Sequence, residues 1–173
     1  RLQATDSALE TINNVLHRVT EIAVAGASAN TNNVRVNMAP EVIQLREAAL
    51  AAANSRSVDG EYLFASFAAT VAPFDAAGAY LDGTATRAVQ VGAGLQISAT
   101  IPGSRLTNVA SGANVNVFTV LDAITAALAG NDRAAVQAEL SRLQQAVRQV
   151  STARGEVGGY MRGMEEAEEA RAQ

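Results

Sequence analysis

The residues of this sequence that could carry out chemistry are few. Cysteine is absent, which excludes thiol nucleophiles, thiolate metal sites and disulfides together. The single histidine, His17, is predicted to lie on an exposed helix face, and no sequence neighbour supplies the partners that a catalytic or zinc-binding histidine needs. No serine lies in a Gly-x-Ser-x-Gly elbow. Nucleophilic catalysis therefore has no assembled parts.

Two other patterns also favour a structural interpretation. The acidic run Glu165, Glu166, Glu168 and Glu169 lacks the ligand spacing and the glycine turn of a calcium loop, so a solvated helix face is predicted. Gly92-Ala93-Gly94 is not followed by Gly-Lys-Ser/Thr, so it indicates a hairpin turn rather than a phosphate site. The ionisable residues of the central segment are scattered: Asp75, Asp82 and Arg87. We expect no enzyme, and no catalytic, cofactor-binding or metal-binding residue.

The composition narrows the possible partners. The formal net charge is -4, and every basic residue is arginine. A nucleic-acid or anionic-membrane surface would need a basic excess on one face, so neither partner is expected. No apolar run reaches the length of about 18 residues that a membrane span needs, and no cleavable secretory peptide is visible. Alanine supplies much of the apolar fraction, which predicts a thin, helical core.

The longest periodic stretch runs from Asn131 to Ala170. Its large apolar residues recur at alternating steps of four and three, the seam of a coiled coil or long bundle. A helix of this length would measure about 60 Å and would need a long partner to cover its stripe. The predicted seam residues of this helix are Leu140, Leu143, Val147, Val150, Val157 and Met161.

The partner is predicted at the other end of the sequence. A matching heptad runs from Leu2 to about Ala27, with the seam residues Leu9, Ile12, Leu16 and Val19. A second helix is expected from about Ala39, with Asn37 as its cap and Pro40 in its first turn. A third is expected over Val117–Ala129, and Asn131 or Asp132 is expected to cap the last helix.

Two features of the last helix suggest contacts beyond simple pairing. Arg154 lies on the apolar seam, which predicts a buried ion pair or a contact with another subunit. Gly158 and Gly159 each cost about 1 kcal/mol relative to alanine inside a helix. Close helix approach or a flex point would explain them, and simple tolerance is the alternative.

The segment between the helices has a different character. Aromatic residues gather from Tyr62 to Tyr80, and apolar residues alternate on both sides of Gly92-Ala93-Gly94, which predicts a β-hairpin with one buried face. Asp82-Gly83 indicates another turn. The predicted fold is therefore mainly α with a β insertion. A discontinuous antiparallel helical rod (1–57 and 113–173) carries a small antiparallel β module (58–112) at one end, with both termini at the other.

Several short motifs carry a family resemblance. Residues 54–65 read Asn-Ser-Arg-Ser-Val-Asp-Gly-Glu-Tyr-Leu-Phe-Ala, and Pro73-Phe74 and Tyr80-Leu81-Asp82-Gly83 follow. Together with the opening and closing helices, these motifs resemble the bacterial flagellar hook-associated protein 3 family, over essentially the whole chain. Ser66, the order Asp82-Gly83 and Met161 depart from the family pattern. The signature residues, expected to form the core of the β module, are Gly60, Tyr62, Leu63, Phe64, Pro73, Phe74 and Tyr80.

The resemblance implies a structural role. It implies a non-enzymatic adaptor at the hook–filament junction, extracellular and exported unfolded by the flagellar type III system, in a form here lacking both terminal segments. The implied partners are neighbouring copies in a ring, the preceding hook-associated junction protein, flagellin and an export chaperone. Arg154, Gly158 and Arg162 resemble a flagellin-type element and are candidate subunit contacts. A flagellin filament subunit and an unrelated coiled-coil interaction module remain the alternatives.

Overall fold

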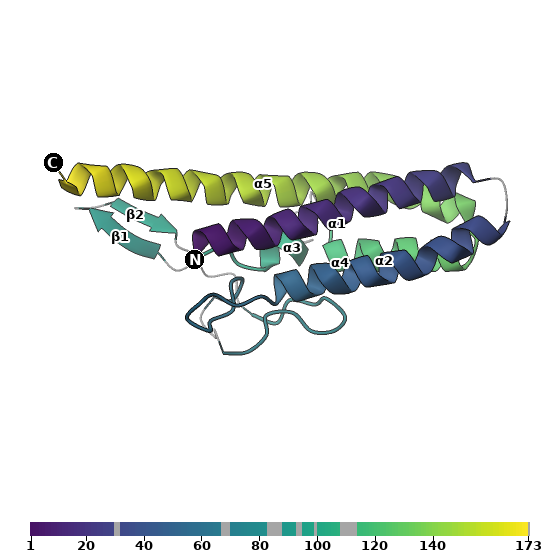
Figure 1. Cartoon of the computed structure of the whole chain (residues 1–173), viewed down its shortest axis with the longest axis horizontal. Coiled ribbons are helices and arrows are strands. Elements are labelled where there is room, and N and C mark those ends of the chain that lie inside the picture. The colour runs from purple at the N-terminus through teal and green to yellow at the C-terminus, as the bar shows by residue number, and fades with distance from the viewer. Residues whose placement is uncertain are drawn as a thin grey trace.

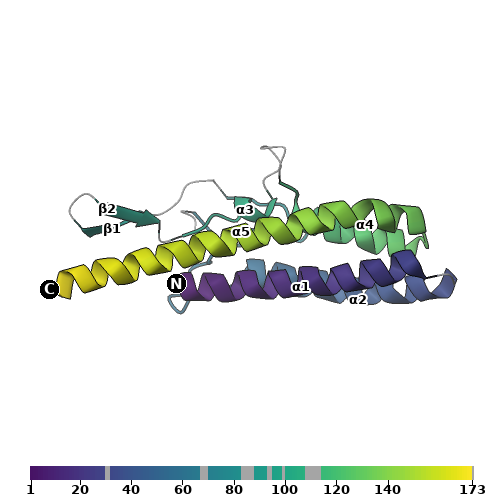
Figure 2. The ribbon, with the colours of Figure 1, turned by 90° about the horizontal axis from the view of Figure 1, so that it is seen from above.

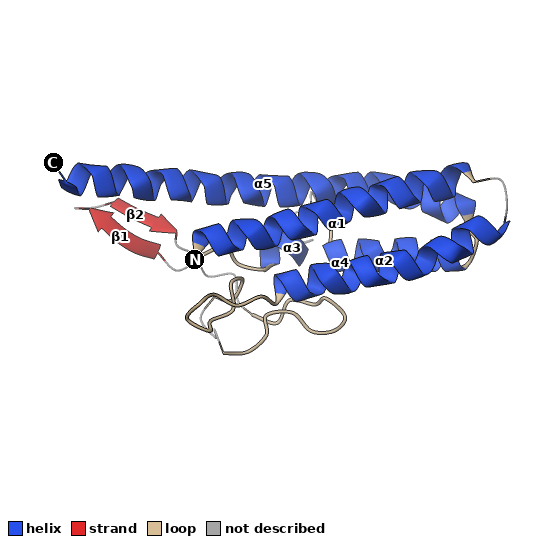
Figure 3. Ribbon diagram, viewed as in Figure 1, coloured by secondary structure: helices blue, strands red, loops and turns tan. Residues whose placement is uncertain are grey.

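The chain folds into a bundle of long helices with a loop-rich segment on one side. The computed structural model describes residues 1–29, 32–66, 70–82, 88–92, 95–98, 100–107 and 114–172. The long helices are α1 (Leu2–Ser28), α2 (Asn32–Ala53), α4 (Val117–Ala129) and α5 (Arg133–Ala172). The shorter elements are α3 (Ser104–Thr107), β1 (Ala88–Gly92) and β2 (Leu95–Ser98). Helix dominates the described structure (Figure 3).

The four long helices are arranged as the corners of a bundle. α1 packs against α5 and α2, and α4 packs against α2 and α5, whereas α2 and α5 do not contact each other. Figures 1 and 2 place α2 and α5 at opposite corners, running in the same direction, with α1 and α4 antiparallel to them. α5 continues past the start of α1, and both termini lie toward the same end.

The α1–α5 contact is built from the two predicted stripes. Leu9, Ile12, Leu16 and Val19 of α1 are fully buried, as are Leu143, Val150 and Val157 of α5. The other three seam residues pack at the edge of the core with partial exposure: Leu140, Val147 and Met161. α1 spans 27 residues and α5 spans 40, so α1 covers most but not all of the α5 stripe.

α2 begins earlier than the sequence predicted. It starts at Asn32, so Asn37 does not cap it and Pro40 lies inside the helix. The extra turns form because Arg35 is buried against the end of α1, a tertiary interaction that outweighs the local turn signal of the asparagines. Pro40 is exposed, so the helix carbonyl that lacks a donor because of the proline is on the solvent side.

The turn between α4 and α5 follows the predicted capping chemistry more closely. α4 spans Val117–Ala129 as predicted, and Gly130 is its C-cap. Asn131 has a positive φ of 52°, and the Asp132 carboxylate accepts a hydrogen bond of 2.9 Å from the Ala135 amide at the start of α5. This turn fixes the antiparallel return of the chain.

The predicted β module is wrong. In the described part of residues 58–112, regular strand is confined to β1 and β2, which pair antiparallel as a two-stranded ribbon. Two such short strands cannot enclose a core. The described aromatic residues of this segment instead lie in irregular stretches, residues 54–66 and 70–82, that we call the aromatic loop. Its Phe64 and Phe74 belong to the same hydrophobic cluster as the helices.

The position of the hairpin also differs from the expectation. β1 and β2 contact α5 and lie beside its C-terminal part, at the end of the bundle where the termini are (Figures 1 and 2). The predicted turns at Asp82-Gly83 and Gly92-Ala93-Gly94 lie partly outside the described residues, and so do Arg87 and the boundary at residue 112. Ile101 of the predicted buried hairpin face is buried, whereas its other side chains are outside the described part: Val89, Val91, Leu95, Ile97 and Ala99.

The aromatic loop is fitted closely onto α4. Phe74 stacks edge-on against Phe118 of α4, with ring centroids 5.5 Å apart, and against Tyr80 at 5.2 Å. Gly78 has a positive φ of 78°, and a Cβ at this position would lie 2.3 Å from the Cβ of Phe118. Gly60 has a similar φ of 81°, but nothing lies within 4 Å of its hypothetical Cβ.

These two glycines provide a matched test of the packing. Gly60→Ala should cost roughly 1 kcal/mol of unfolding free energy, the strain of a left-handed alanine. Gly78→Ala adds a steric clash with a buried ring, so we expect a loss of at least about 3 kcal/mol. Chemical denaturation of both variants measures the difference. Equal losses would mean that the loop does not pack against Phe118.

Candidate functional site

The ionisable residues singled out in the sequence do not converge. His17 and the four glutamates from Glu165 to Glu169 are all exposed. Within the described residues, no group of three histidine, cysteine, aspartate or glutamate side chains could hold a metal ion. No described helix is both long and apolar enough to cross a membrane. The candidate functional features of the described chain are therefore its surfaces and the contacts that position them.

Arg154 links the two seam helices. Its Nε and Nη2 atoms lie 3.0 and 3.3 Å from the two carboxylate oxygens of Asp6 on α1, and Glu10 is 3.8 Å away. The side chains of Arg154 and Asp6 are 30% and 29% exposed, so the pair is only partly buried. Hydrogen bonding to Asp6 raises the pKa of Arg154. The sequence predicted either a buried ion pair or a subunit contact for Arg154. The structure has an ion pair within the chain, although it is only partly buried.

Arg35 fastens three elements at the far end of the bundle. Its Nη1 donates to the carbonyls of Gly26 and Ala29 at the end of α1, at 3.2 and 2.6 Å. Its Nε donates to Oδ1 of Asn131, 96 residues away in the turn between α4 and α5, at 2.7 Å. A cation at a helix C-terminus satisfies carbonyls that have no helical donor. Arg35 is 5% exposed, so these bonds are inside the protein.

Two amides hold the irregular segments against the helices. Asn54, at the end of α2, both donates to and accepts from the backbone of Phe74, at 3.0 Å each. Gln149 of α5 donates to the carbonyls of Arg105 and Val115 and accepts from the Val115 amide. These bonds replace the ladder that a β module would have supplied.

The signature residues line the interior and rim of the aromatic loop. Leu63, Phe64, Pro73 and Phe74 are buried, Tyr62 and Tyr80 are half-buried, and Gly60 is exposed. The Tyr62 ring lies under Arg56, whose guanidinium carbon is 4.3 Å from the ring centroid. The Tyr80 hydroxyl donates to the Phe64 carbonyl at 3.1 Å, and burial raises the pKa of Tyr80 above its ordinary value of 10.0.

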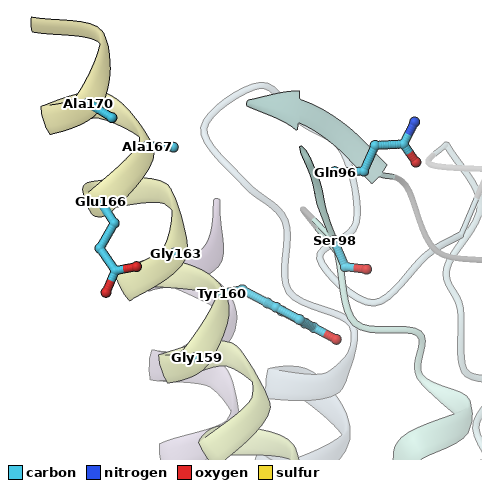
Figure 4. Close-up of a pocket in the computed structure, with 8 residues that line it drawn as sticks. All are labelled: Gln96, Ser98, Gly159, Tyr160, Gly163, Glu166, Ala167 and Ala170. Carbon is cyan, nitrogen blue, oxygen red and sulfur yellow. The ribbon is translucent and has the colours of Figure 1, made fainter. Parts of the chain in front are cut away.

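The last turns of α5 border two hollows. One has a volume of about 500 Å³ and lies between α5 and β2. Tyr160 projects from α5 toward the Ser98 side of this hollow, and the small residues Gly159 and Gly163 lie on either side of it along the helix (Figure 4). The other, about 350 Å³, lies where α1 begins and is bordered by Met161 and Met164. Neither hollow gathers ionisable groups in an arrangement that could carry out catalysis.

The candidate subunit contacts Arg154, Gly158 and Arg162 follow one another at four-residue spacing along α5. Gly158 is half-buried, and a Cβ there would meet only Arg162 Nη1, at 3.7 Å. Arg162 itself is exposed on the outer side of the helix. Their role in subunit contact stays a prediction.

The sequence and the fold of this chain are similar to those of known flagellar proteins. Residues 1–69 match the model of the bacterial flagellin N-terminal helical region. A putative flagellar hook-associated protein from Vibrio parahaemolyticus has a TM-score of 0.85 at 22% identity, over 99% of this chain and 79% of that one. FlgL from Xanthomonas campestris has a TM-score of 0.86 at 17% identity, over 99% and 89%.

The chain has the fold of the flagellar hook-associated proteins. The flagellar junction protein FlgL from Legionella pneumophila supports this, with a TM-score of 0.79 at 12% identity over 95% of this chain and 91% of that one. None of the curated proteins matches in sequence. The resemblance stated from the sequence motifs is therefore confirmed at the level of the hook-associated fold.

The sequence did not predict the long-range bonds of the polar residues that fasten this hook-associated fold, although Asn131 was a candidate helix cap. Arg35, Asn131 and Gln149 belong to no periodic stripe, and each binds a partner far away in the sequence. Arg35 had no local signal either, because α2 also contains Glu41, Arg46 and Glu47. Arg46, which pairs with Asp122 of α4 at 2.5 Å, had no sequence signal.

We predict that Arg35→Met destabilises the bundle by about 2–4 kcal/mol, because it leaves buried carbonyls without donors. Arg18→Met is the matched control. Arg18 also bridges helices, through Glu41, but its side chain is 51% exposed, so no change in the thermal midpoint is expected. Thermal unfolding of the two variants gives the comparison. An Arg35→Met midpoint equal to that of Arg18→Met would contradict the proposed fastening.

We also predict an alkaline loss of stability that depends on Tyr80. Its pKa is raised in the folded state, so its contribution is complete below about pH 10 and is lost as the pH rises through the folded value. The chain has no lysine, so no lysine side chain titrates in the same pH range as Tyr80. Tyr80→Phe should cost about 1 kcal/mol at neutral pH, because the Phe64 carbonyl keeps the Gly103 amide as a donor. Its unfolding free energy should fall less steeply between about pH 9 and pH 12 than that of the parent. Identical slopes would contradict the assignment.

Proposed function

We propose that this chain is a structural adaptor subunit of the bacterial flagellum that joins the hook side to the flagellin filament. The observation that carries the proposal is the match in fold to hook-associated proteins and FlgL over 95–99% of the chain. The aromatic loop, whose sequence motifs first suggested the family, is part of that match. Such a subunit works through packed surfaces, which agrees with the scattered ionisable residues.

The bundle geometry supports a load-bearing role. A helix of 40 residues covered along most of its length by α1 forms a stiff rod, and Arg35 and Gln149 tie the irregular segments to it. We propose that copies pack side by side around the flagellar axis. In this arrangement they contact the preceding hook-associated junction protein on one side and flagellin on the other. We further propose that the full-length chain is exported by the flagellar type III system, with a chaperone, to an extracellular position.

A flagellin filament subunit is the second candidate. The match of residues 1–69 to the flagellin N-terminal helical region favours it. The two candidates differ in where the protein lies, at a single junction or along a filament. They can therefore be separated in cells.

The test is complementation in a strain that lacks this protein. We expect the deletion strain to be non-motile, with intact hooks and flagellin shed into the medium, and the full-length gene to restore attached filaments. Hooks that still carry filaments in the deletion strain would remove the adaptor proposal. Filaments shortened or absent without shed flagellin would favour the flagellin candidate.

A further inference from the structure

α2 has a second apolar face that the described chain does not cover. Val36 and Ile43 point away from the core and are 43% and 41% exposed, and Pro40 is also exposed. Positions 36, 40, 43 and 47 are spaced by four, three and four residues, so they form one line along the helix. A helix that is apolar on opposite sides is normally covered on both. We call this line, with Glu47 and Ala51, the α2 outer face.

Glu47 gives this face a distinctive charge. It is exposed in the middle of the apolar line, and in the part of the chain that the structure describes it has no hydrogen-bond or ion-pair partner. Neighbouring charges on α2 are different, because Glu41 pairs with Arg18 and Arg46 pairs with Asp122. A surface complementary to this face would therefore carry an unpaired arginine opposite Glu47, with uncharged residues around that arginine.

α5 has a surface of that kind. Arg133, Arg148 and Arg162 are exposed and have no hydrogen-bond or ion-pair partner among the described residues. The other described arginine side chains each contact a carboxylate, a carbonyl oxygen or a tyrosine. Their spacings of 15 and 14 residues place the three on one side of the helix. Between them, a Cβ at Gly155 would meet nothing within 4 Å. We call this side, defined by these four residues, the α5 outer face.

The two faces point in opposite directions. α2 and α5 occupy opposite corners of the bundle and do not touch, so their outward sides are on opposite flanks of the molecule (Figures 1 and 2). A contact between α2 of one copy and α5 of another is therefore heterologous. Repeated heterologous contacts produce a ring or a helical array rather than a closed pair.

The levels of the two faces along the bundle also agree. The bond between Arg35 and Asn131 sets the starts of α2 and α5 at a similar level along the bundle, and both helices then run in the same direction. Glu47 lies roughly 18 Å beyond Arg35, and Arg148 roughly 25 Å beyond Asn131. The difference of about 7 Å can be spanned by the two long side chains. Copies standing at the same height could therefore make this contact.

We propose that the α2 outer face of one copy docks on the α5 outer face of the next, with Glu47 paired to Arg148. Val36 and Ile43 are covered by the neighbour, and the exposed arginines of α5 receive a partner. The contact would join neighbouring copies in the proposed flagellar assembly, and its flagellar context rests on the proposed function. The contact itself is a property of the chain and can be measured without cells.

Directed cross-linking tests the contact, because the protein has no native cysteine. We expect the variant Glu47→Cys/Arg148→Cys, treated at high concentration with a short bifunctional maleimide, to give a ladder of dimers, trimers and larger species. Asn14→Cys/Arg148→Cys is the matched control, since Asn14 is exposed on α1. This control and each single-cysteine variant should stay monomeric.

A second pair of variants tests the apolar part. In the cross-linking background, Ile43→Asp should reduce the ladder about fivefold or more, because it places a charge in the contact. Gln44→Asp adds the same charge to a neighbouring exposed position off this line and should leave the ladder unchanged.

Three outcomes would overturn the inference. Dimers from Glu47→Cys alone would make the α2 outer face a symmetric contact. Absence of the ladder at the highest soluble concentration would remove the pairing. A ladder equally reduced by Ile43→Asp and Gln44→Asp would remove the apolar contact. If the ladder forms while complementation fails, the contact stands and the junction role does not. If complementation succeeds without a ladder, only this contact is wrong.

Discussion

The pairing of α1 with α5 is the constraint on which the rest of the structure depends. An isolated helix is marginal in water, and α5 has 40 residues with an apolar stripe along most of them. The stripe becomes stable only where another helix covers it, and α1 supplies 27 residues of cover. α4 and α2 then close the bundle on the remaining side. At the start of α1, Met161 and Met164 are only partly covered, and the nearby glutamates from Glu165 to Glu169 are exposed.

Polar side chains, together with isolated backbone bonds, position the described loop segments against the long helices. Asn54 binds the backbone of Phe74 as a neighbouring strand would, and Gln149 does the same for Val115. Arg35, near the start of α2, likewise binds the end of α1 and the turn between α4 and α5. Because buried backbone groups need partners, a loop that packs aromatic rings into a helical core needs such side chains. The aromatic loop is therefore ordered without being a β module.

This arrangement explains which parts of the fold could be predicted from sequence. The helix over Val117–Ala129 and the start of α1 at Leu2 follow from local periodicity, so they were predicted closely. α2 was predicted to start too late because the bond that favours its first turns joins Arg35 to Asn131, 96 residues away. The aromatic residues were expected to form the core of a β module, but Phe74 packs against Tyr80 and against Phe118 of α4. Aromatic and β-branched composition does not distinguish a sheet core from a loop packed on helices. The polar fasteners had no periodic signal at all.

If the proposed subunit assembles through packed surfaces, its contacts are made by surface groups that have no partner within its own fold. In the described chain these include the exposed arginines of α5 and the apolar line of α2, on opposite flanks. An exposed Glu–Arg pair contributes little free energy, so Glu47 and Arg148 would set the register rather than the strength of a contact. Covering Val36 and Ile43 would add a modest apolar contribution, and a contact made by so few side chains would be weak. Each copy in a ring makes two such contacts, so a weak pairwise interface is compatible with a stable assembly and with subunits that stay separate before they reach it.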